Sequence, residues 1–88
     1  MKPINWSATF KLHYKERIAK DEHLRKAFWD TVDGFLFHRQ WVGDHLLQGK
    51  MADKASFEIT PEYRVVYLER EGDFLFLDVG THEQVYIR

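Results

Sequence analysis

The sequence has no cysteine, no excess of positive charge and no long hydrophobic run, and each absence excludes something. Without cysteine, the 88 residues can form neither a disulfide nor a thiolate metal site. Lysine and arginine number 13 against 14 acidic residues, for a net charge of −1, whereas dedicated nucleic-acid-binding domains are usually basic. No apolar run approaches the ~20 residues of a membrane span, and the N-terminus lacks the apolar core of a signal peptide. We therefore expect a cytoplasmic protein that does not bind membranes.

Aromatic residues, by contrast, are abundant. The length fits one domain, residues 1–88, and a domain of this size buries only about 60–65% of the surface of its unfolded chain. Aromatic side chains make up 16% of the sequence, and each of them buries a large area. They are therefore expected to help stabilise an otherwise thin core.

The N-terminal half has the spacing of helices. An aromatic or aliphatic residue at every fourth position predicts a helix over residues 8–19, and Ser7 is positioned to cap its first turn. A longer regular apolar face predicts a second helix over residues 22–38. Because almost nothing joins the two helices, they should form an antiparallel hairpin that covers one face of a sheet. Pro3 restricts residues 2–6 to an edge strand at most.

The C-terminal third is typical of an antiparallel meander. Apolar runs rich in aromatic and β-branched residues, separated by turn signals, predict strands over residues 55–59, 63–69 and 74–79. Residues 83–87 are expected to return briefly to strand. Residues 39–54 form an irregular connection, and connections of this length are uncommon and often functional. The expected fold is therefore α+β, with two N-terminal helices packed on a small, mainly antiparallel β-sheet.

Three motifs carry a resemblance to a known family. They are His45-Leu46-Leu47-Gln48-Gly49-Lys50, Tyr63-Arg64-Val65-Val66-Tyr67, and Gly80-Thr81-His82 followed by Val85-Tyr86. In their order and spacing they resemble the RelE/ParE superfamily of toxins from bacterial type II toxin–antitoxin systems, over nearly the whole chain and most closely the YafQ-like branch. The resemblance implies a RelE-like fold and a ribosome-dependent mRNA endonuclease that inhibits translation, uses no cofactor, and is neutralised by a cognate antitoxin protein. Two alternatives stay open: a toxin that poisons DNA gyrase, and a degenerate homologue that only binds its antitoxin.

The same resemblance indicates a site. Metal-free RNA cleavage needs a base for the 2′-hydroxyl, an acid for the leaving 5′-oxygen, and cations for the charge on the phosphate. Histidine suits the first two tasks and arginine the third, while tyrosine can stack on a base or donate a hydrogen bond. The positions that match the family's catalytic residues are His82, Arg64, Tyr86 and His45, and those that would contact substrate are Lys50, Lys54 and Glu62. The other histidines lack metal-ligand spacing, so no metal site is predicted.

Two carboxylates depart from the family pattern. Asp78 stands where the YafQ-like branch has an arginine, and Glu58 stands where it has a histidine. A carboxylate beside an RNA phosphate repels it, so both residues favour the degenerate alternative. Each candidate also has a structural interpretation: Arg64 in an ion pair within the fold, Tyr86 as a core aromatic, one histidine at the surface and the other as a loop anchor, and the lysines and Glu62 as solvated groups.

The geometry of the site depends on the hairpin and on the chain after it. A three-residue turn would place Arg64 opposite Asp78, ready for a salt bridge, whereas a two- or four-residue turn would place it opposite Val79 and free to reach solvent. In a straight strand, His82 and Tyr86 would lie about 13 Å apart. A bend between them would be needed to bring the two side chains together.

Overall fold

The computed structural model describes residues 2–38, 45–47 and 53–86. Its elements are β1 (Ile4–Trp6), α1 (Ala8–His13), the π-helical segment η1 (Tyr14–Ile18), α2 (Glu22–His38), β2 (His45–Leu46), β3 (Ala55–Glu58), β4 (Tyr63–Glu69), β5 (Phe74–Thr81) and α3 (His82–Tyr86). The sheet has the order β1-β5-β4-β3-β2, with β1 parallel to β5 and the other pairs antiparallel. The predicted α+β fold is therefore confirmed. No helix in the described part of the chain has the length and hydropathy needed to cross a bilayer.

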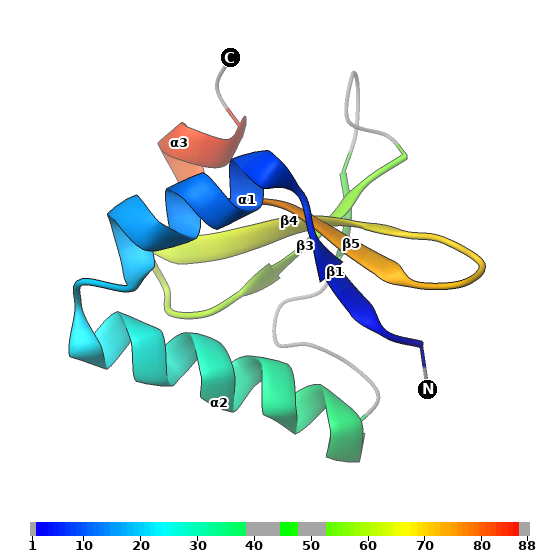
Figure 1. Ribbon diagram of the computed structural model, residues 1–88, viewed down its shortest axis with the longest axis horizontal. Coiled ribbons are helices and arrows are strands. Elements are labelled where there is room, and N and C mark those ends of the chain that lie inside the picture. Colours follow the sequence, from blue (N-terminus) through cyan, green and yellow to red (C-terminus); the bar gives the residue numbers. More distant parts are fainter. Residues whose placement is uncertain (1, 39–44, 48–52, 87–88) are drawn as a thin grey trace.

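The two predicted N-terminal helices are present, and each begins at a side-chain cap. Ser7 Oγ accepts a hydrogen bond from the Phe10 backbone N–H at 3.0 Å, and Asp21 Oδ1 accepts one from the Leu24 N–H at 3.1 Å. The first helix runs from α1 directly into η1, so its last turn is π-helical. A short turn then reverses the chain into α2, and the two segments run antiparallel (Figure 1).

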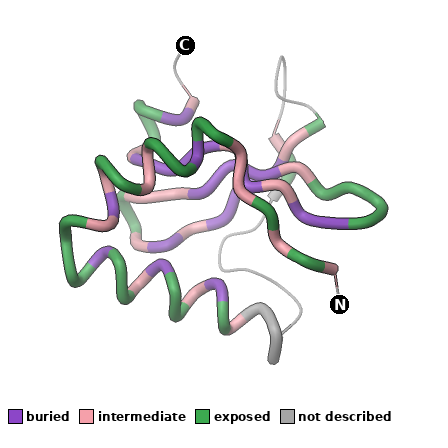
Figure 2. The backbone as a smooth tube through the Cα atoms, in the orientation of Figure 1, coloured by how far each residue is buried: buried purple, intermediate pink, exposed green. Residues whose placement is uncertain are grey.

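The core lies between the helices and one face of the sheet, and Phe76 of β5 stands near its centre. This side chain is fully buried. Its ring centroid lies 5.3 Å from that of Phe10 on α1, 5.6 Å from that of Phe57 on β3 and 6.3 Å from that of Phe28 on α2. Figure 2 shows the buried positions concentrated along the strands and at intervals along the helices. Aromatic rings thus connect the sheet with both α1 and α2, in agreement with the core role that the composition predicted for them.

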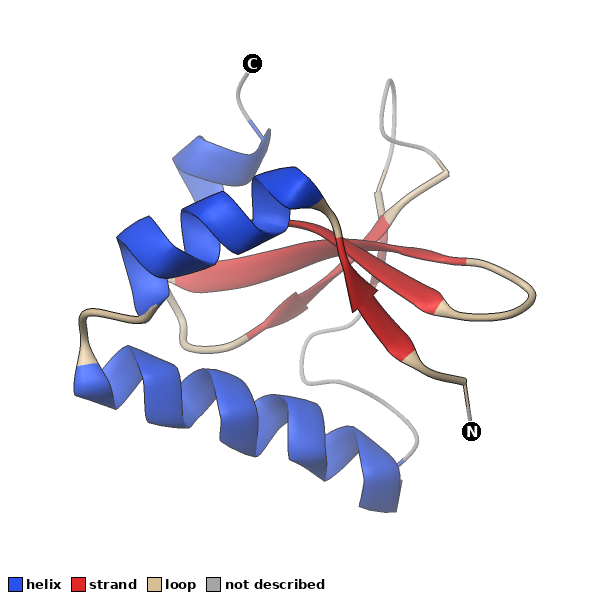
Figure 3. Ribbon diagram, in the orientation of Figure 1, coloured by secondary structure: helices blue, strands red, loops and turns tan. Residues whose placement is uncertain are grey.

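The opposite face of the sheet is covered by α3. Side chains alternate along a strand, so the neighbours of the core residues Phe57 and Val65 point away from the core. Two such neighbours, Ser56 and Val66, are register partners of each other, and Val66 is also the partner of Asp78, the neighbour of the core residue Val79 on β5. Figure 3 shows α2 on one side of the strands and α3 on the other. The two faces of the sheet therefore differ in character: one packs against the apolar core, and the other carries a row of side chains that includes the polar residues Ser56 and Asp78.

The prediction of a strand over residues 83–87 is wrong, because residues 82–86 form α3. The reason is a reciprocal cap at the start of the helix. Thr81 Oγ1 accepts a hydrogen bond from the Gln84 N–H at 3.3 Å, and Gln84 Oε1 accepts one from the Thr81 N–H at 2.8 Å. This capping box satisfies two backbone donors at once and favours a helical turn after β5.

Both pairings expected for Arg64 are also wrong. Residues 70–73 separate β4 from β5, and a four-residue turn alone would have placed Arg64 opposite Val79. A register shift after Val66 moves the pairing by one more residue, so that Arg64 lies opposite Gly80 and Asp78 lies opposite Val66. Such a bulge changes which side chains meet across two strands and cannot be read from the turn length.

The hairpin itself makes stability depend on pH. The Arg70 guanidinium beside Asp73, helped by the Asn5 amide, lowers the pKa of this carboxyl from its ordinary 3.8 to about 2. A carboxylate with a lowered pKa stabilises the fold above pH 3.8, and its contribution is lost as the pH falls toward 2. We therefore expect Asp73→Asn to lower the midpoint of thermal unfolding at pH 7, by a difference that shrinks between pH 3.8 and 2.

The check is a series of thermal unfolding curves from pH 7 down to the acid limit of the wild type. Asp30→Asn is a matched control, because Asp30 is an exposed partner of Lys26 on α2 and exposed pairs contribute little. A difference between wild type and Asp73→Asn that stays constant with pH would contradict the expectation.

Candidate functional site

Three of the four predicted catalytic residues come together where α3 lies on the sheet. His82 and Tyr86 are four residues apart on the helix, and their rings meet edge to face with centroids 4.4 Å apart and planes at 71°. Arg64 of β4 donates a hydrogen bond from Nε to the Tyr86 hydroxyl at 2.9 Å. The chain is not a straight strand here, so the separation of about 13 Å does not apply: α3 supplies the bend that was needed, because a helix places residues i and i+4 on one face.

A buried serine that the motif search missed anchors this cluster. Ser56 of β3 is fully buried, and its Oγ accepts a hydrogen bond from the Tyr86 hydroxyl at 2.5 Å and one from Arg64 Nε at 3.3 Å. The serine hydroxyl on β3 thus holds the tyrosine of α3 and the arginine of β4 together. The only sequence signal for it was a small polar residue inside an apolar strand.

Arg64 is held at the site with an acidic neighbour. Its side chain is 14% exposed, and Nη1 lies 3.8 Å from Glu58 Oε1. The ion pair within the fold, foreseen as the structural interpretation of Arg64, is present, although the partner is Glu58 and not Asp78. Because the Glu58 carboxylate is 34% exposed, solvent screens it and the pair contributes little. The Ser56 and Tyr86 hydroxyls both accept hydrogen bonds from Nε and so help to orient the guanidinium.

Asp78, the carboxylate expected to oppose RNA most, is directed at the first helix. It is 3% exposed. Its Oδ1 lies 2.6 Å from Nδ1 of His13 and 3.5 Å from Nη1 of Arg17, and it accepts a hydrogen bond from the Val79 N–H at 2.8 Å. Buried carboxylates are tolerated when they are paired and hydrogen-bonded in this way. Asp78 therefore ties β5 to α1 and η1, with its charge opposed by neighbouring side chains.

A hollow beside the cluster brings a further predicted residue close to His82. It has a volume of about 410 Å³ and is lined by Pro61, Glu62, Thr81, His82 and Glu83. Glu62 is exposed in the turn between β3 and β4, and this turn faces the start of α3. The predicted substrate contact at Glu62 and the predicted proton-transfer residue thus share one open surface.

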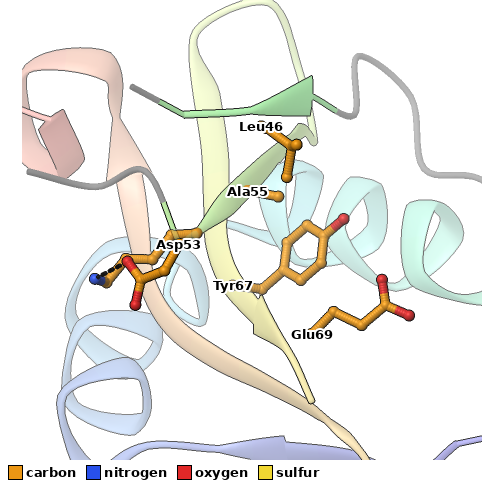
Figure 4. A pocket seen from close by; sticks show the side chains of 6 residues that line it. Leu46, Asp53, Ala55, Tyr67 and Glu69 are labelled. Atoms are coloured by element: carbon orange, nitrogen blue, oxygen red, sulfur yellow. Dashed lines mark hydrogen bonds and ion pairs between the residues drawn. The ribbon is translucent and has the colours of Figure 1, made fainter. Parts of the chain in front are cut away.

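The remaining predicted residues lie elsewhere or outside the described residues. Lys54 Nζ donates to the adjacent Asp53 carboxylate at 3.0 Å, and both line a separate pocket of about 290 Å³ (Figure 4). The other residues lining that pocket are Leu46, Ala55, Tyr67 and Glu69. The backbone of His45 pairs with that of Ser56, which places β2 beside the strand that anchors the cluster, while the His45 side chain and all of Lys50 lie outside the described residues.

The described residues include no group of three histidine, aspartate or glutamate side chains that could hold a metal ion. What the cluster offers instead is a pair of aromatic rings, one of them an imidazole exposed to solvent, next to a fixed guanidinium. A group of this kind can transfer a proton beside a bound anion without a metal.

Solved structures share this architecture along nearly the whole chain. E. coli YafQ is 18% identical in sequence over 98% of this chain and 99% of its own, with a TM-score of 0.75. The chain has the YafQ fold. A metal-bound toxin from Helicobacter pylori matches at 24% identity over 98% of this chain and all of its own (TM-score 0.77), and a YoeB/ParE toxin from Agrobacterium tumefaciens at 22% over 93% and 99% (TM-score 0.73).

The resemblance read from the motifs is confirmed at the level of the fold, since YafQ and the YoeB/ParE toxin both share it. No protein-family model matches the sequence, and no curated protein matches it either. Within the YafQ fold of this chain, the candidate residues come from β3, β4 and α3. They meet because β3 and β4 are neighbours and α3 folds back over β4 and β5, from where the Tyr86 hydroxyl reaches Ser56 on β3.

Proposed function

We propose that this chain is the toxin of a toxin–antitoxin pair and cleaves mRNA on the ribosome without a metal ion. The observation that carries the proposal is the hydrogen-bonded cluster of Arg64, Tyr86 and Ser56 with His82 packed against it, on a YafQ fold. A fold alone hosts many activities. The residues gathered at this place are those that RNA cleavage by proton transfer requires.

In the proposed reaction, the 2′-hydroxyl of one nucleotide attacks the adjacent phosphorus. A new P–O2′ bond forms and the P–O5′ bond breaks, which leaves a 2′,3′-cyclic phosphate and a free 5′-hydroxyl. The 2′-hydroxyl loses a proton and the leaving 5′-oxygen gains one; His82 transfers the proton at one of these oxygens and solvent water at the other, while Arg64 stabilises the negative charge that builds on the phosphate. Tyr86 positions both, because its ring packs against His82 and its hydroxyl accepts the Arg64 bond. Glu62, on the same hollow as His82, accepts a hydrogen bond from a ribose hydroxyl.

Two partners accompany this proposal. A net charge of −1 supplies little general attraction for RNA, so the ribosome is expected to position the mRNA. A cognate antitoxin is proposed as the second partner, because one structure that shares the fold is an E. coli DinJ-YafQ toxin-antitoxin complex, 19% identical over 97% of each chain (TM-score 0.73).

A second candidate function is binding of the antitoxin without nuclease activity. The observation that favours it is Glu58, whose carboxylate lies 3.8 Å from the Arg64 guanidinium and competes with a phosphate for it. The first proposal is preferred because the Ser56 and Tyr86 hydroxyls that hold the Arg64 Nε are neutral, and because His82 packs against Tyr86 at the same place.

Expression in bacteria from a tightly controlled promoter tests the proposal. We expect the wild type to arrest growth and to leave mRNA cut within translated regions, and Arg64→Ala to lose both effects because the phosphate loses its cation. Arg25→Ala is the control, since Arg25 lies on α2 and its side chain donates only to the Ala19 carbonyl among the described residues. Growth arrest with DNA damage and intact mRNA would point to gyrase instead, and normal growth of cells that contain folded wild type would leave only the antitoxin-binding candidate.

A further inference from the structure

A second arginine reaches the face of the sheet on which Arg64 lies. Gly80 of β5 is buried, and a Cβ atom built on it would lie 2.8 Å from Nη1 of Arg17 and 2.5 Å from Oε1 of Gln84. Any larger residue would push these two side chains away. The glycine therefore leaves the space into which η1 extends the Arg17 guanidinium, over the edge of β5 and beside α3.

The strand register shows on which side of the sheet this guanidinium lies. Gly80 is the direct antiparallel partner of Arg64, and side chains of such partners share one face, with Cβ atoms about 4.5–5.5 Å apart. Nη1 of Arg17 lies next to the position that a Gly80 side chain would occupy. This nitrogen is therefore close to the Cβ atom of Arg64. The Arg17 guanidinium thus lies on the face that α3 covers, at the β5 position that pairs with Arg64, while the Arg64 guanidinium extends across the same face toward Ser56 and Glu58 of β3.

The contacts of Arg17 fix its position and leave part of it available. Nη1 donates to the Val79 carbonyl at 2.9 Å and lies 3.5 Å from Asp78 Oδ1. In the described part of the chain these are its hydrogen-bonding contacts, so Nε and Nη2 have no partner among those residues, and the side chain is 22% exposed. A guanidinium held at one nitrogen can present the others to an anion, which is how arginine binds phosphate.

We propose that Arg17 is a second phosphate-binding cation of this site and binds the RNA backbone beside Arg64. The inference rests on the proposed function, because it assigns a further contact for the same substrate. Asp78 serves this contact by holding Arg17 across the strand edge, with His13 as its second partner. Asp78, one of the two carboxylates that argued against a nuclease in the sequence, thereby anchors a cation that comes from η1.

Binding of single-stranded RNA at several salt concentrations tests the inference. The probe is a fluorescent oligonucleotide that carries 2′-O-methyl groups throughout and so cannot be cleaved. For single strands, each phosphate contact adds about 0.7 to the slope of log affinity against log salt. We expect Arg17→Gln and Arg64→Gln each to reduce the slope by about that amount, Arg17→Lys to retain it, and the control Arg25→Gln to match the wild type.

The slope separates a phosphate contact from a structural role, because a loosened fold changes the fraction of active protein and not the number of ions released. Thermal unfolding of each variant checks that it is folded; Arg17→Met, which keeps the aliphatic stem, replaces Arg17→Gln if the latter does not fold. An unchanged slope in the Arg17 variants with a reduced slope in Arg64→Gln would overturn this inference and leave the proposed function standing. No binding by the wild type, even at the lowest salt concentration, would overturn the inference and leave the proposed function standing, because there the ribosome positions the mRNA. No effect of either arginine on the slope would overturn both.

Discussion

Replacing His82 by glutamine should slow mRNA cleavage by about 10²–10⁴-fold, the range that one positioned proton-transfer group contributes. Glutamine is similar in size to histidine and can form hydrogen bonds, but its amide cannot take up or release a proton near neutral pH. His82 is exposed at the start of α3, and the Thr81–Gln84 cap that begins this helix does not involve its side chain. The loss should therefore appear in the chemical step and not in stability.

Single-turnover cleavage of mRNA on purified ribosomes measures this step directly, and unfolding curves run in parallel measure stability. His23→Gln is the matched control, because His23 is an exposed histidine in the first turn of α2 and lies outside the cluster. If His82→Gln cleaved at the wild-type rate, His82 could not be the proton-transfer group. If His23→Gln lost as much, the loss would reflect something common to histidine replacements.

Replacing Phe76 by alanine should destabilise the fold by about 3–5 kcal/mol, the cost of emptying a large aromatic site in a packed core. Phe76 is fully buried, and its ring contacts aromatic rings from α1, α2, β3 and β4. Domains of ordinary stability have only about 5–15 kcal/mol in total, and small domains bury less surface than large ones. The variant should consequently be partly unfolded at moderate temperature.

Urea unfolding followed by tryptophan fluorescence gives the free energy of unfolding for this comparison. Leu12→Ala is the control, since Leu12 is an apolar residue of α1 that is 53% exposed and exposed substitutions usually change stability by less than about 0.5 kcal/mol. A loss below about 1 kcal/mol in Phe76→Ala would mean that the cavity closes by rearrangement, and that the rings around Phe76 are not fixed in place as the structure has them.

The sequence predicted those elements whose residues repeat along one face. The helices and the three main strands follow from periodicity and from caps such as Ser7, which act within a few residues. The strand predicted at residues 83–87 shows the limit, because Val85 and Tyr86 favour strand while Thr81 and Gln84 form a capping box. Both signals were visible, and the local cap determined the structure.

The site was predictable as a set of residues and not as an arrangement. The motifs identified His82, Arg64 and Tyr86, which the structure brings together. The roles of Ser56 and Arg17 depend on which residues face each other across strands: the pairing of β3 with β4 for Ser56, and the register shift after Val66 between β4 and β5 for Arg17. A bulge has no reliable signature in one sequence, so the contacts that depend on it could not be foreseen.

The attachment of α3 also has a consequence for when the cluster can exist. Synthesis proceeds from the N-terminus, and Tyr86 follows in the chain every other residue of the cluster. A helix of five residues is not stable by itself, so α3 forms only once β4 and β5 are in place to receive it. Until Tyr86 has been synthesised and has left the ribosome, Arg64 and Ser56 therefore lack the tyrosine hydroxyl that joins them in the folded chain.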